Sequence, residues 1–117
     1  MTAGARTPEE LDALLEDAFV VNDREAPDVL FVDGAVLTHA GGPEARGGEA
    51  IGQVLTDLWS RGCTYVARPG RVVRVRDMAL LVSGTATHVL RRDRDGTWRA
   101  VISLLHVHPT TREENDR

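Results

Sequence analysis

The sequence of 117 residues predicts an α+β protein in which helices pack on one face of a mostly antiparallel sheet. In the N-terminal half, apolar residues recur at spacings of three and four, which is typical of amphipathic helices. From Cys63 onward, alternating and β-branched runs indicate strands. A turn sequence at residues 93–96 separates the last two runs, so the C-terminal third is expected to contain a hairpin.

The first predicted helix has a well-defined start. Thr7 is a favourable N-cap, Pro8 suits the first helical position, and Glu10 occupies the capping-box position. The apolar stripe of this helix consists of Leu11, Leu14, Leu15, Ala18 and Phe19. This face is expected to pack inward, and the helix is expected to end near Asn22.

Two more helices and two short strands complete the N-terminal half. Residues 23–31 are predicted to form a short helix, and residues 35–39 a strand. Residues 44–47 are predicted to form a brief edge strand. Residues 49–61 carry an apolar stripe with helical spacing, and Gly62 is a suitable stop for that helix.

The remaining strands are predicted from alternation. Residues 64–68 and 71–76 are expected to form a strand or a strand pair, interrupted at residues 69–70 by proline and glycine. The alternation in residues 71–76 places arginines on one face, which is expected to meet water or a partner subunit. Residues 78–90 and 97–108 are predicted to be two long strands.

The register of the final hairpin has two alternatives. If residues 94–96 form a three-residue loop, His88 lies opposite Ile102 and roughly 13 Å from His106. If residues 95–96 form a two-residue turn, His88 and His106 lie on opposite faces of the sheet. Neither register brings the two histidines together, so no metal site is predicted.

Composition excludes several classes of function. The net charge of −4 argues against nucleic-acid binding, which depends on clustered positive charge. All fourteen basic residues are arginine, which excludes a lysine Schiff base and the phosphate-loop lysine. Cys63 is the single cysteine and cannot form an internal disulfide. No cofactor is predicted. The absence of a long apolar run or an apolar signal core predicts a cytoplasmic protein without a membrane partner.

Three segments resemble the nuclear transport factor 2-like superfamily, in particular its small bacterial ketosteroid-isomerase-like and SnoaL-like members. These are residues 31–37, 46–51 and 89–99. The resemblance implies a single domain over residues 1–108, whereas the polar residues 109–117 are expected to be a disordered tail. It implies a cone, in which a strongly curved, mixed and mostly antiparallel sheet wraps three N-terminal helices and encloses a pocket open at one end. It also implies a homodimer formed through the outer face of the sheet.

Two histidines are the predicted catalytic residues. His39 ends the predicted strand 35–39 and His106 lies within the predicted strand 97–108, and imidazole has an ordinary pKa near neutral pH, which suits proton transfer. His106 follows the largely apolar residues 102–105 and is therefore expected to point inward. The alternative for both residues is a buried structural histidine that is hydrogen-bonded to a neighbour.

Five further residues are predicted to bind a ligand: Asp23, Trp59, Tyr65, His88 and Ser103. Asp23 could supply a carboxylate base or could cap the next helix. Trp59 and Tyr65 could wall a pocket for a cyclic ligand or could belong to the core. Ser103 could orient a ligand through its hydroxyl group.

The predicted function is that of a small-molecule pocket protein. It is expected to catalyse cofactor-independent acid–base chemistry, such as isomerisation, cyclisation or dehydration, on a small apolar or cyclic substrate. The alternative is a non-catalytic ligand-binding or dimerisation module in which the histidines are structural. The fold hosts both kinds of protein, so fold alone does not decide between them.

Overall fold

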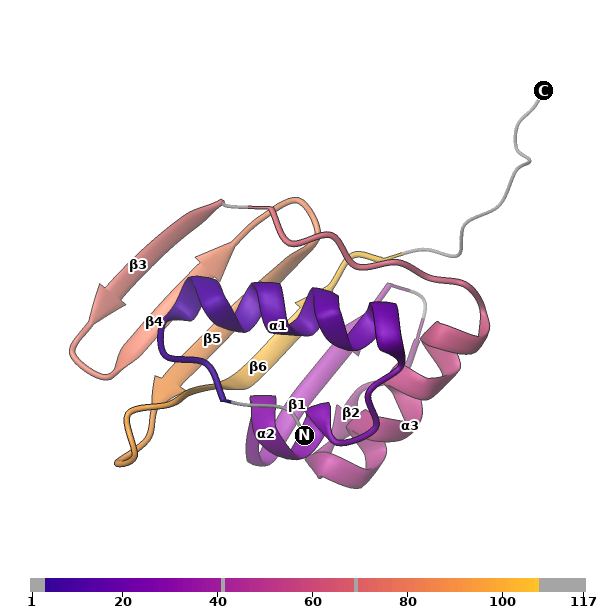
Figure 1. Cartoon of the computed structure of the whole chain (residues 1–117), viewed down its shortest axis with the longest axis horizontal. Coiled ribbons are helices and arrows are strands. Elements are labelled where there is room, and N and C mark those ends of the chain that lie inside the picture. Colours follow the sequence, from indigo (N-terminus) through magenta and orange to yellow (C-terminus); the bar gives the residue numbers. More distant parts are fainter. Residues whose placement is uncertain (1–3, 41, 69, 108–117) are drawn as a thin grey trace.

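The computed structural model describes residues 4–40, 42–68 and 70–107 (Figure 1). These residues form three helices and six strands. In chain order the elements are α1 (Pro8–Val21), α2 (Ala26–Leu30), β1 (Phe31–His39), β2 (Ala45–Arg46), α3 (Gly47–Ser60), β3 (Arg71–Val75), β4 (Met78–Val82), β5 (Ala86–Arg92) and β6 (Trp98–Leu105). The α+β prediction is confirmed. The tail predicted at residues 109–117 lies outside the described residues.

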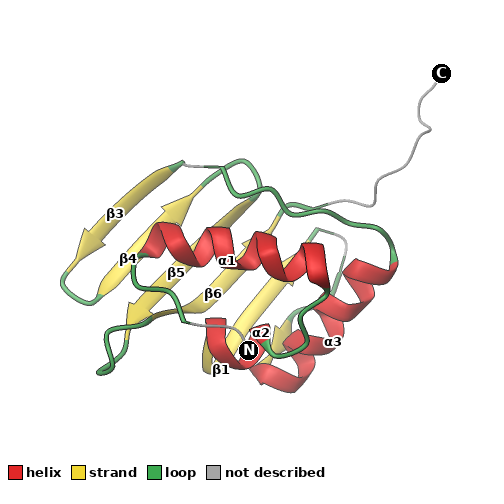
Figure 2. Cartoon of the chain, in the orientation of Figure 1, coloured by secondary structure: helices red, strands yellow, loops and turns green. Residues whose placement is uncertain are grey.

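The six strands form one open sheet in the order β2-β1-β6-β5-β4-β3. β1 and β6 are parallel, and the other neighbouring pairs are antiparallel. The sheet is therefore mixed and mostly antiparallel, as predicted. α1 crosses in front of the sheet, and α3 lies near β1 and β2 (Figure 2). No helix among the described residues is long and apolar enough to cross a membrane.

α1 begins and ends where the sequence predicts. The Thr7 side chain accepts a hydrogen bond of 3.0 Å from the Glu10 backbone N–H, which satisfies one free donor of the first turn. Asn22 ends the helix in the left-handed conformation, with φ of 55°. The buried face of α1 consists of Pro8, Leu11, Asp12, Leu15, Ala18 and Phe19. One charged residue therefore lies on the apolar side of this helix.

The structure corrects two of the strand predictions. Residues 78–90 form two antiparallel strands, because Ser83 closes a tight turn: its backbone N–H donates to the Ala86 carbonyl at 2.9 Å. The Ser83 hydroxyl oxygen also accepts from the Thr85 and Ala86 backbone N–H groups, each at 3.2 Å. Residues 64–68 do not form a strand.

The arginines of β3 do not share a face, which corrects the prediction for residues 71–76. Arg71 pairs with Val82 and Arg74 with Ala79, three positions apart, so the two arginines point to opposite faces. Arg76 lies beyond the strand, in the turn to β4, with φ of 55°. The alternation of arginine with valine is therefore interrupted, because two valines, Val72 and Val73, separate Arg71 from Arg74 and because Arg76 lies in the turn.

The final hairpin has the predicted three-residue loop. The Asp93 backbone N–H donates to the Thr97 carbonyl at 2.8 Å, and Gly96 is left-handed with φ of 85°. Farther along, a bulge leaves Val101 without a direct partner and shifts the register by one residue. His88 therefore lies opposite Ser103, which corrects the predicted pairing with Ile102.

Candidate functional site

A row of directly paired residues crosses the sheet on the face that α1 covers. In order from β3 to β1, the row is Val72, Leu81, His88, Ser103 and Leu37. Directly opposite residues place their side chains on the same face. His88 and Ser103 are fully buried, so the centre of the row is polar inside an otherwise apolar core.

A chain of hydrogen bonds connects this polar centre to α1. His88 Nδ1 lies 2.7 Å from Ser103 Oγ, and His88 Nε2 lies 2.9 Å from the hydroxyl oxygen of Tyr65. The Tyr65 hydroxyl group donates to Asp12 Oδ1. Four side chains from α1, the segment before β3, β5 and β6 are thus joined end to end.

The segment between α3 and β3 brings Tyr65 to this site. It runs along α1 back toward β3 (Figure 1). The Ala67 backbone N–H donates to Glu16 Oε1 at 3.3 Å, and the Thr85 hydroxyl group donates to the Val66 carbonyl at 2.9 Å. The segment is therefore held on one side by α1 and on the other by the turn before β5.

Burial disfavours the charged forms of the three titratable groups in this series of hydrogen bonds, Asp12, Tyr65 and His88. Burial is the main cause that raises the pKa of Asp12, although the hydrogen bond from Tyr65 acts against it; the carboxylate of Glu16 adds to the rise. Burial raises the pKa of Tyr65, and the neighbouring Asp12 raises it further. Burial lowers the pKa of His88 to about 4, so this imidazole is neutral near pH 7.

Asp12 also forms part of the wall of a cavity of about 520 Å³. The cavity lies between α1, the segment before β3, and the end of the residue row formed by Val72 on β3 and Leu81 on β4. Its lining residues are Glu9, Asp12, Ala13, Glu16, Ala67, Arg68, Gly70, Val72 and Leu81. The volume is in the range of small-molecule sites, and the wall combines apolar side chains with a few polar groups. One end of the buried hydrogen-bond chain therefore meets a space that a ligand could occupy.

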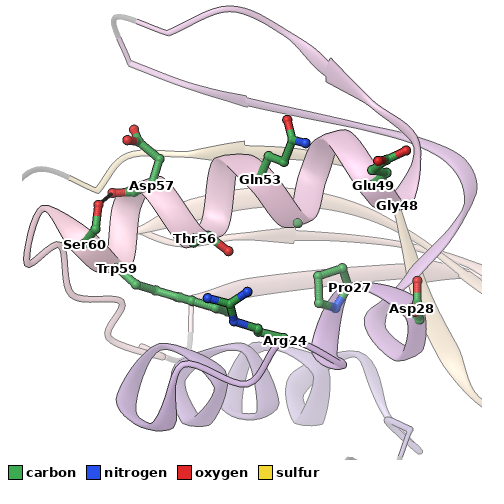
Figure 3. Close-up of a pocket in the computed structure, with 11 residues that line it drawn as sticks. Arg24, Pro27, Asp28, Gly48, Glu49, Gln53, Thr56, Asp57, Trp59 and Ser60 are labelled. Carbon is green, nitrogen blue, oxygen red and sulfur yellow. Dashed lines mark hydrogen bonds between the residues drawn. The ribbon is translucent and has the colours of Figure 1, made fainter.

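A larger cavity of about 690 Å³ lies between α3 and the region of α2. Trp59 and Thr56 project from α3 toward Arg24 and Pro27 (Figure 3). Trp59 packs edge-on against Phe19, with ring centroids 6.0 Å apart. Its indole N–H is buried and has no hydrogen-bond partner among the described residues. The smaller cavity differs from this one in that its wall contains Asp12, a buried carboxyl group with a raised pKa.

The predicted catalytic histidines do not meet in this site. His106 is exposed, so the prediction that it points inward is wrong: β6 ends at Leu105, and the alternation places His106 on the opposite side. Its backbone N–H donates to the Thr85 carbonyl at 2.7 Å. His39 is half-buried and lines a separate cavity of about 400 Å³ beside α3. A catalytic role for either histidine stays a prediction.

The structure brings three of the five predicted ligand-binding residues together and places the other two elsewhere, apart from each other. Tyr65, His88 and Ser103 come together in the hydrogen-bond chain. Trp59 lies in the larger cavity, and the Asp23 carboxylate accepts a hydrogen bond of 2.9 Å from the Glu25 backbone N–H just before α2. Asp23 therefore does not cap α2, whose N-cap residue is Glu25 without a side-chain hydrogen bond, and its carboxylate instead stabilises the turn before the helix.

Asp12 is the site residue that the sequence reasoning missed. The available signal was its spacing: Asp12 precedes Leu15 by three positions and Phe19 by seven, so it lies on the apolar face of α1. An acidic residue in such a stripe requires a polar partner inside the protein. That partner, Tyr65, is 53 positions away along the chain.

Among the described residues, no group of three or more histidine, cysteine, aspartate or glutamate side chains could hold a metal ion. The acid–base groups of the site are one buried carboxyl group, one phenol, one neutral imidazole and one hydroxyl group, and two further carboxylates, Glu9 and Glu16, lie at the cavity wall.

Solved structures with this arrangement of elements are similar over most of the chain. An NTF2-like protein with a cystatin-like fold from Novosphingobium aromaticivorans is 23% identical, with a TM-score of 0.68, over 89% of this chain and 81% of that one. A ketosteroid isomerase-like protein from Erwinia carotovora atroseptica is 20% identical, with a TM-score of 0.67, over 84% and 92% of the two chains.

A suspected dehydratase of the NTF2-like family from Streptomyces avermitilis is 17% identical, with a TM-score of 0.65, over 86% of this chain and 92% of that one. No sequence-family description matches the chain, and no curated protein matches it. These structural likenesses concern the course of the backbone and leave the activity open. The chain has the nuclear transport factor 2-like fold that its sequence predicts.

Proposed function

We propose that the cavity beside α1 binds a small, largely apolar molecule and that Asp12 exchanges a proton with it. The observation that carries the proposal is the position of Asp12: its carboxyl group is buried, has a raised pKa, and lies in the cavity wall. A carboxyl group whose pKa is raised toward neutral pH is a more effective general acid or base there.

The cavity wall supports this assignment. Val72, Leu81 and Ala13 supply apolar contacts for a ligand, and Arg68 and Glu16 supply polar groups at the same wall. Tyr65 holds the Asp12 carboxyl group from behind, so its orientation is fixed before a ligand enters. Isomerisation, cyclisation and dehydration each require removal of a proton from carbon and delivery of a proton, which goes to carbon in an isomerisation, to the carbonyl oxygen in an aldol-type cyclisation and to the leaving hydroxyl group in a dehydration. One positioned carboxyl group can perform both transfers.

Occupancy of the cavity can be tested with a neutral apolar dye such as Nile red. Ala13→Trp would place a large ring in the cavity from the exposed side of α1, so we expect dye affinity to fall at least about tenfold, or roughly 1.4 kcal/mol. Val20→Trp is the matched control, because Val20 is an exposed residue of the same helix and is not among the residues that line this cavity. Fluorescence titration of all three proteins measures the effect. Equal dye affinity in Ala13→Trp and the unmodified protein would remove the cavity from the proposal.

We also propose that two copies of the chain associate through the outer face of the sheet. This face is the side opposite α1, and it carries exposed large apolar residues on β3, β4 and β6. They are Val73, Val75, Met78, Leu80, Val82, Ile102 and Leu104. The pairs Val73–Leu80 and Val89–Ile102 continue one another across the sheet through the Leu80–Val89 pair. Contiguous apolar surface of this kind is typical of an interface between subunits.

Leu80→Arg tests the interface at the middle of this row. An arginine on each copy would place like charges in an apolar contact, so we expect a dimer to become a monomer. Val21→Arg on α1 is the control, because Val21 is equally apolar and more exposed but lies on the helix. Sedimentation equilibrium gives the masses. A monomeric unmodified protein, or a Leu80→Arg variant that stays dimeric, would contradict the interface.

A further inference from the structure

The hydrogen bonds behind Asp12 have a direction, and that direction follows from the number of protons available. A phenol has one O–H donor, and a neutral imidazole has one N–H donor and one bare nitrogen acceptor. His88 is neutral near pH 7 because burial lowers its pKa to about 4. Each of the three hydrogen bonds, Asp12–Tyr65, Tyr65–His88 and His88–Ser103, must therefore be made with a single donated hydrogen.

When Asp12 is ionised, one arrangement satisfies every contact. The carboxylate can only accept, so Tyr65 donates its single hydrogen to Asp12. The 2.9 Å contact between Tyr65 and His88 Nε2 then requires that Nε2 carry the imidazole hydrogen. His88 Nδ1 is consequently bare and accepts from the Ser103 hydroxyl group at 2.7 Å.

When Asp12 is protonated, the opposite arrangement becomes available. The carboxylic acid can donate to the Tyr65 oxygen, which frees the phenol hydrogen to bond to His88 Nε2. The imidazole hydrogen then lies on Nδ1 and is donated to Ser103 Oγ. One proton added at the cavity thus reverses each hydrogen bond in the chain, and His88 changes tautomer without becoming charged.

We propose that His88 and Ser103 are positioning residues that couple the protonation state of Asp12 to the tautomer of His88. The coupling rests on the proposed role of Asp12 as the acid–base group. In the ionised state, His88 donates to the phenol oxygen, which makes the phenol a stronger donor to the carboxylate. In the protonated state, the reversed chain stabilises the carboxylic acid. The chain therefore stabilises both forms that a proton-transfer cycle requires.

Other charged groups near the chain come from two elements. Glu16 and Glu9 lie on α1 at the cavity wall, and Glu16 raises the pKa of Asp12. Arg68 lies at the wall on the segment before β3, and its backbone N–H acts to lower the pKa of Asp12. Glu16 and Arg68 thus modify the pKa of Asp12, which burial raises most. They do not lie between Asp12 and His88, so they do not determine which tautomer accompanies each charge state.

The tautomer can be read directly from the nitrogen chemical shifts of His88 in protein labelled with ¹⁵N at histidine. At the alkaline end of the pH range in which the protein stays folded, the ionised form of Asp12 is favoured, so we expect hydrogen on Nε2. In Asp12→Ala, Tyr65 loses its acceptor on α1 and donates to His88 instead, so we expect hydrogen on Nδ1 at the same pH. Glu16→Gln is the matched control, since it removes a neighbouring carboxylate outside the chain, and the Nε2 tautomer should persist.

Two variants test the route of the coupling. Tyr65→Phe removes the hydroxyl group between Asp12 and His88, so substitution of Asp12 in that background should leave the tautomer of His88 unchanged. Hydrogen on Nδ1 in the unmodified protein at alkaline pH, or on Nε2 in Asp12→Ala, would overturn the inference. If a variant fails to fold, the tautomer of His88 in the unmodified protein still tests the inference, because hydrogen on Nδ1 there would contradict it. The tautomer measurement needs no ligand and is independent of the dye titration. The coupling can therefore be contradicted while dye binding supports the cavity, and the cavity can be contradicted while the tautomer supports the coupling.

Discussion

Asp12→Asn is expected to lower the rate of proton transfer on a molecule bound in the cavity by about 10²- to 10⁴-fold, the usual contribution of a positioned acid–base group. Asparagine has nearly the same shape as aspartate but neither accepts nor releases a proton near neutral pH. Ligand affinity should change much less than the rate, because the apolar contacts of Val72 and Leu81 remain. Single-turnover kinetics and dye titration measure the two effects separately.

Glu16→Gln provides the comparison for this loss of rate. Glu16 lines the same cavity, but it is only partly buried and is hydrogen-bonded to the Ala67 backbone rather than to Tyr65. We expect its substitution to change the rate far less than Asp12→Asn. If Glu16→Gln removes the activity and Asp12→Asn preserves it, the catalytic assignment moves from Asp12 to Glu16.

The same substitution has a predictable effect on stability. The folded-state pKa of Asp12 lies above its ordinary value of 3.8, so between these two values the folded protein binds more protons than the unfolded chain. Stability therefore falls as the pH rises through the folded-state pKa. Asp12→Asn removes the buried charge, so its melting temperature should exceed that of the unmodified protein at alkaline pH. The difference should shrink as the pH falls toward 3.8.

His88 makes a contribution to the pH dependence of stability that is opposite in direction to that of Asp12. Its pKa is lowered from 6.5 to about 4, so its contribution to stability is lost as the pH falls between these values. This loss occurs in both proteins and largely cancels when Asp12→Asn is compared with the unmodified chain. A melting-temperature difference that grows as the pH falls would contradict a raised pKa for Asp12.

Trp98→Ala is expected to lower the free energy of unfolding by about 3–5 kcal/mol, as for other buried tryptophans. Trp98 is 1% exposed at the start of β6. The guanidinium groups of Arg74 and Arg92 lie over its ring, 5.0 and 5.6 Å from the centroid, and its backbone N–H donates to the Ala5 carbonyl at 2.8 Å. Truncation would leave a cavity and remove both cation–π contacts.

Urea denaturation with Trp98→Phe and Trp59→Ala as comparisons gives the test. Phenylalanine retains an aromatic face for the two arginines, so Trp98→Phe should lose clearly less stability than Trp98→Ala. Trp59 is only partly buried, at the edge of the larger cavity, and its truncation should also cost less. Because small domains have a total stability of about 5–15 kcal/mol, the loss in Trp98→Ala should be easily resolved. A loss below about 1 kcal/mol would show that this tryptophan does not anchor the sheet.

Features set by neighbouring residues could be predicted from the sequence. The start of α1 depends on Thr7, Pro8 and Glu10, and its end on Asn22, all of which act within one turn of helix. The three-residue loop of the final hairpin depends on Gly96, which tolerates a left-handed backbone. Where a tight turn interrupted an otherwise strand-like run, as at Ser83, the same local reasoning missed the break because β-branched and apolar residues continue on both sides.

The candidate site depended on contacts that local reasoning does not reach. The bulge at Val101 changes which residue lies opposite His88, and a one-residue change of register decides whether its partner is the hydroxyl group of Ser103 or the apolar side chain of Ile102. His106 was expected to point inward because the residues before it are apolar. In the structure Ser103 and Leu105 occupy the last buried positions of β6, so His106 follows on the exposed side.

The α+β architecture, the ends of α1, the final hairpin and the resemblance to the nuclear transport factor 2-like fold could all be predicted from residue patterns. They depend on periodicity and turn chemistry, which act over a few residues. The connection of Asp12, Tyr65, His88 and Ser103 in one series of hydrogen bonds at the wall of a cavity becomes visible only in the folded chain. The physical reason is that a buried polar group is stabilised by whichever partner the folded chain brings within hydrogen-bond distance, and here the partners are 15 to 53 positions apart in the sequence.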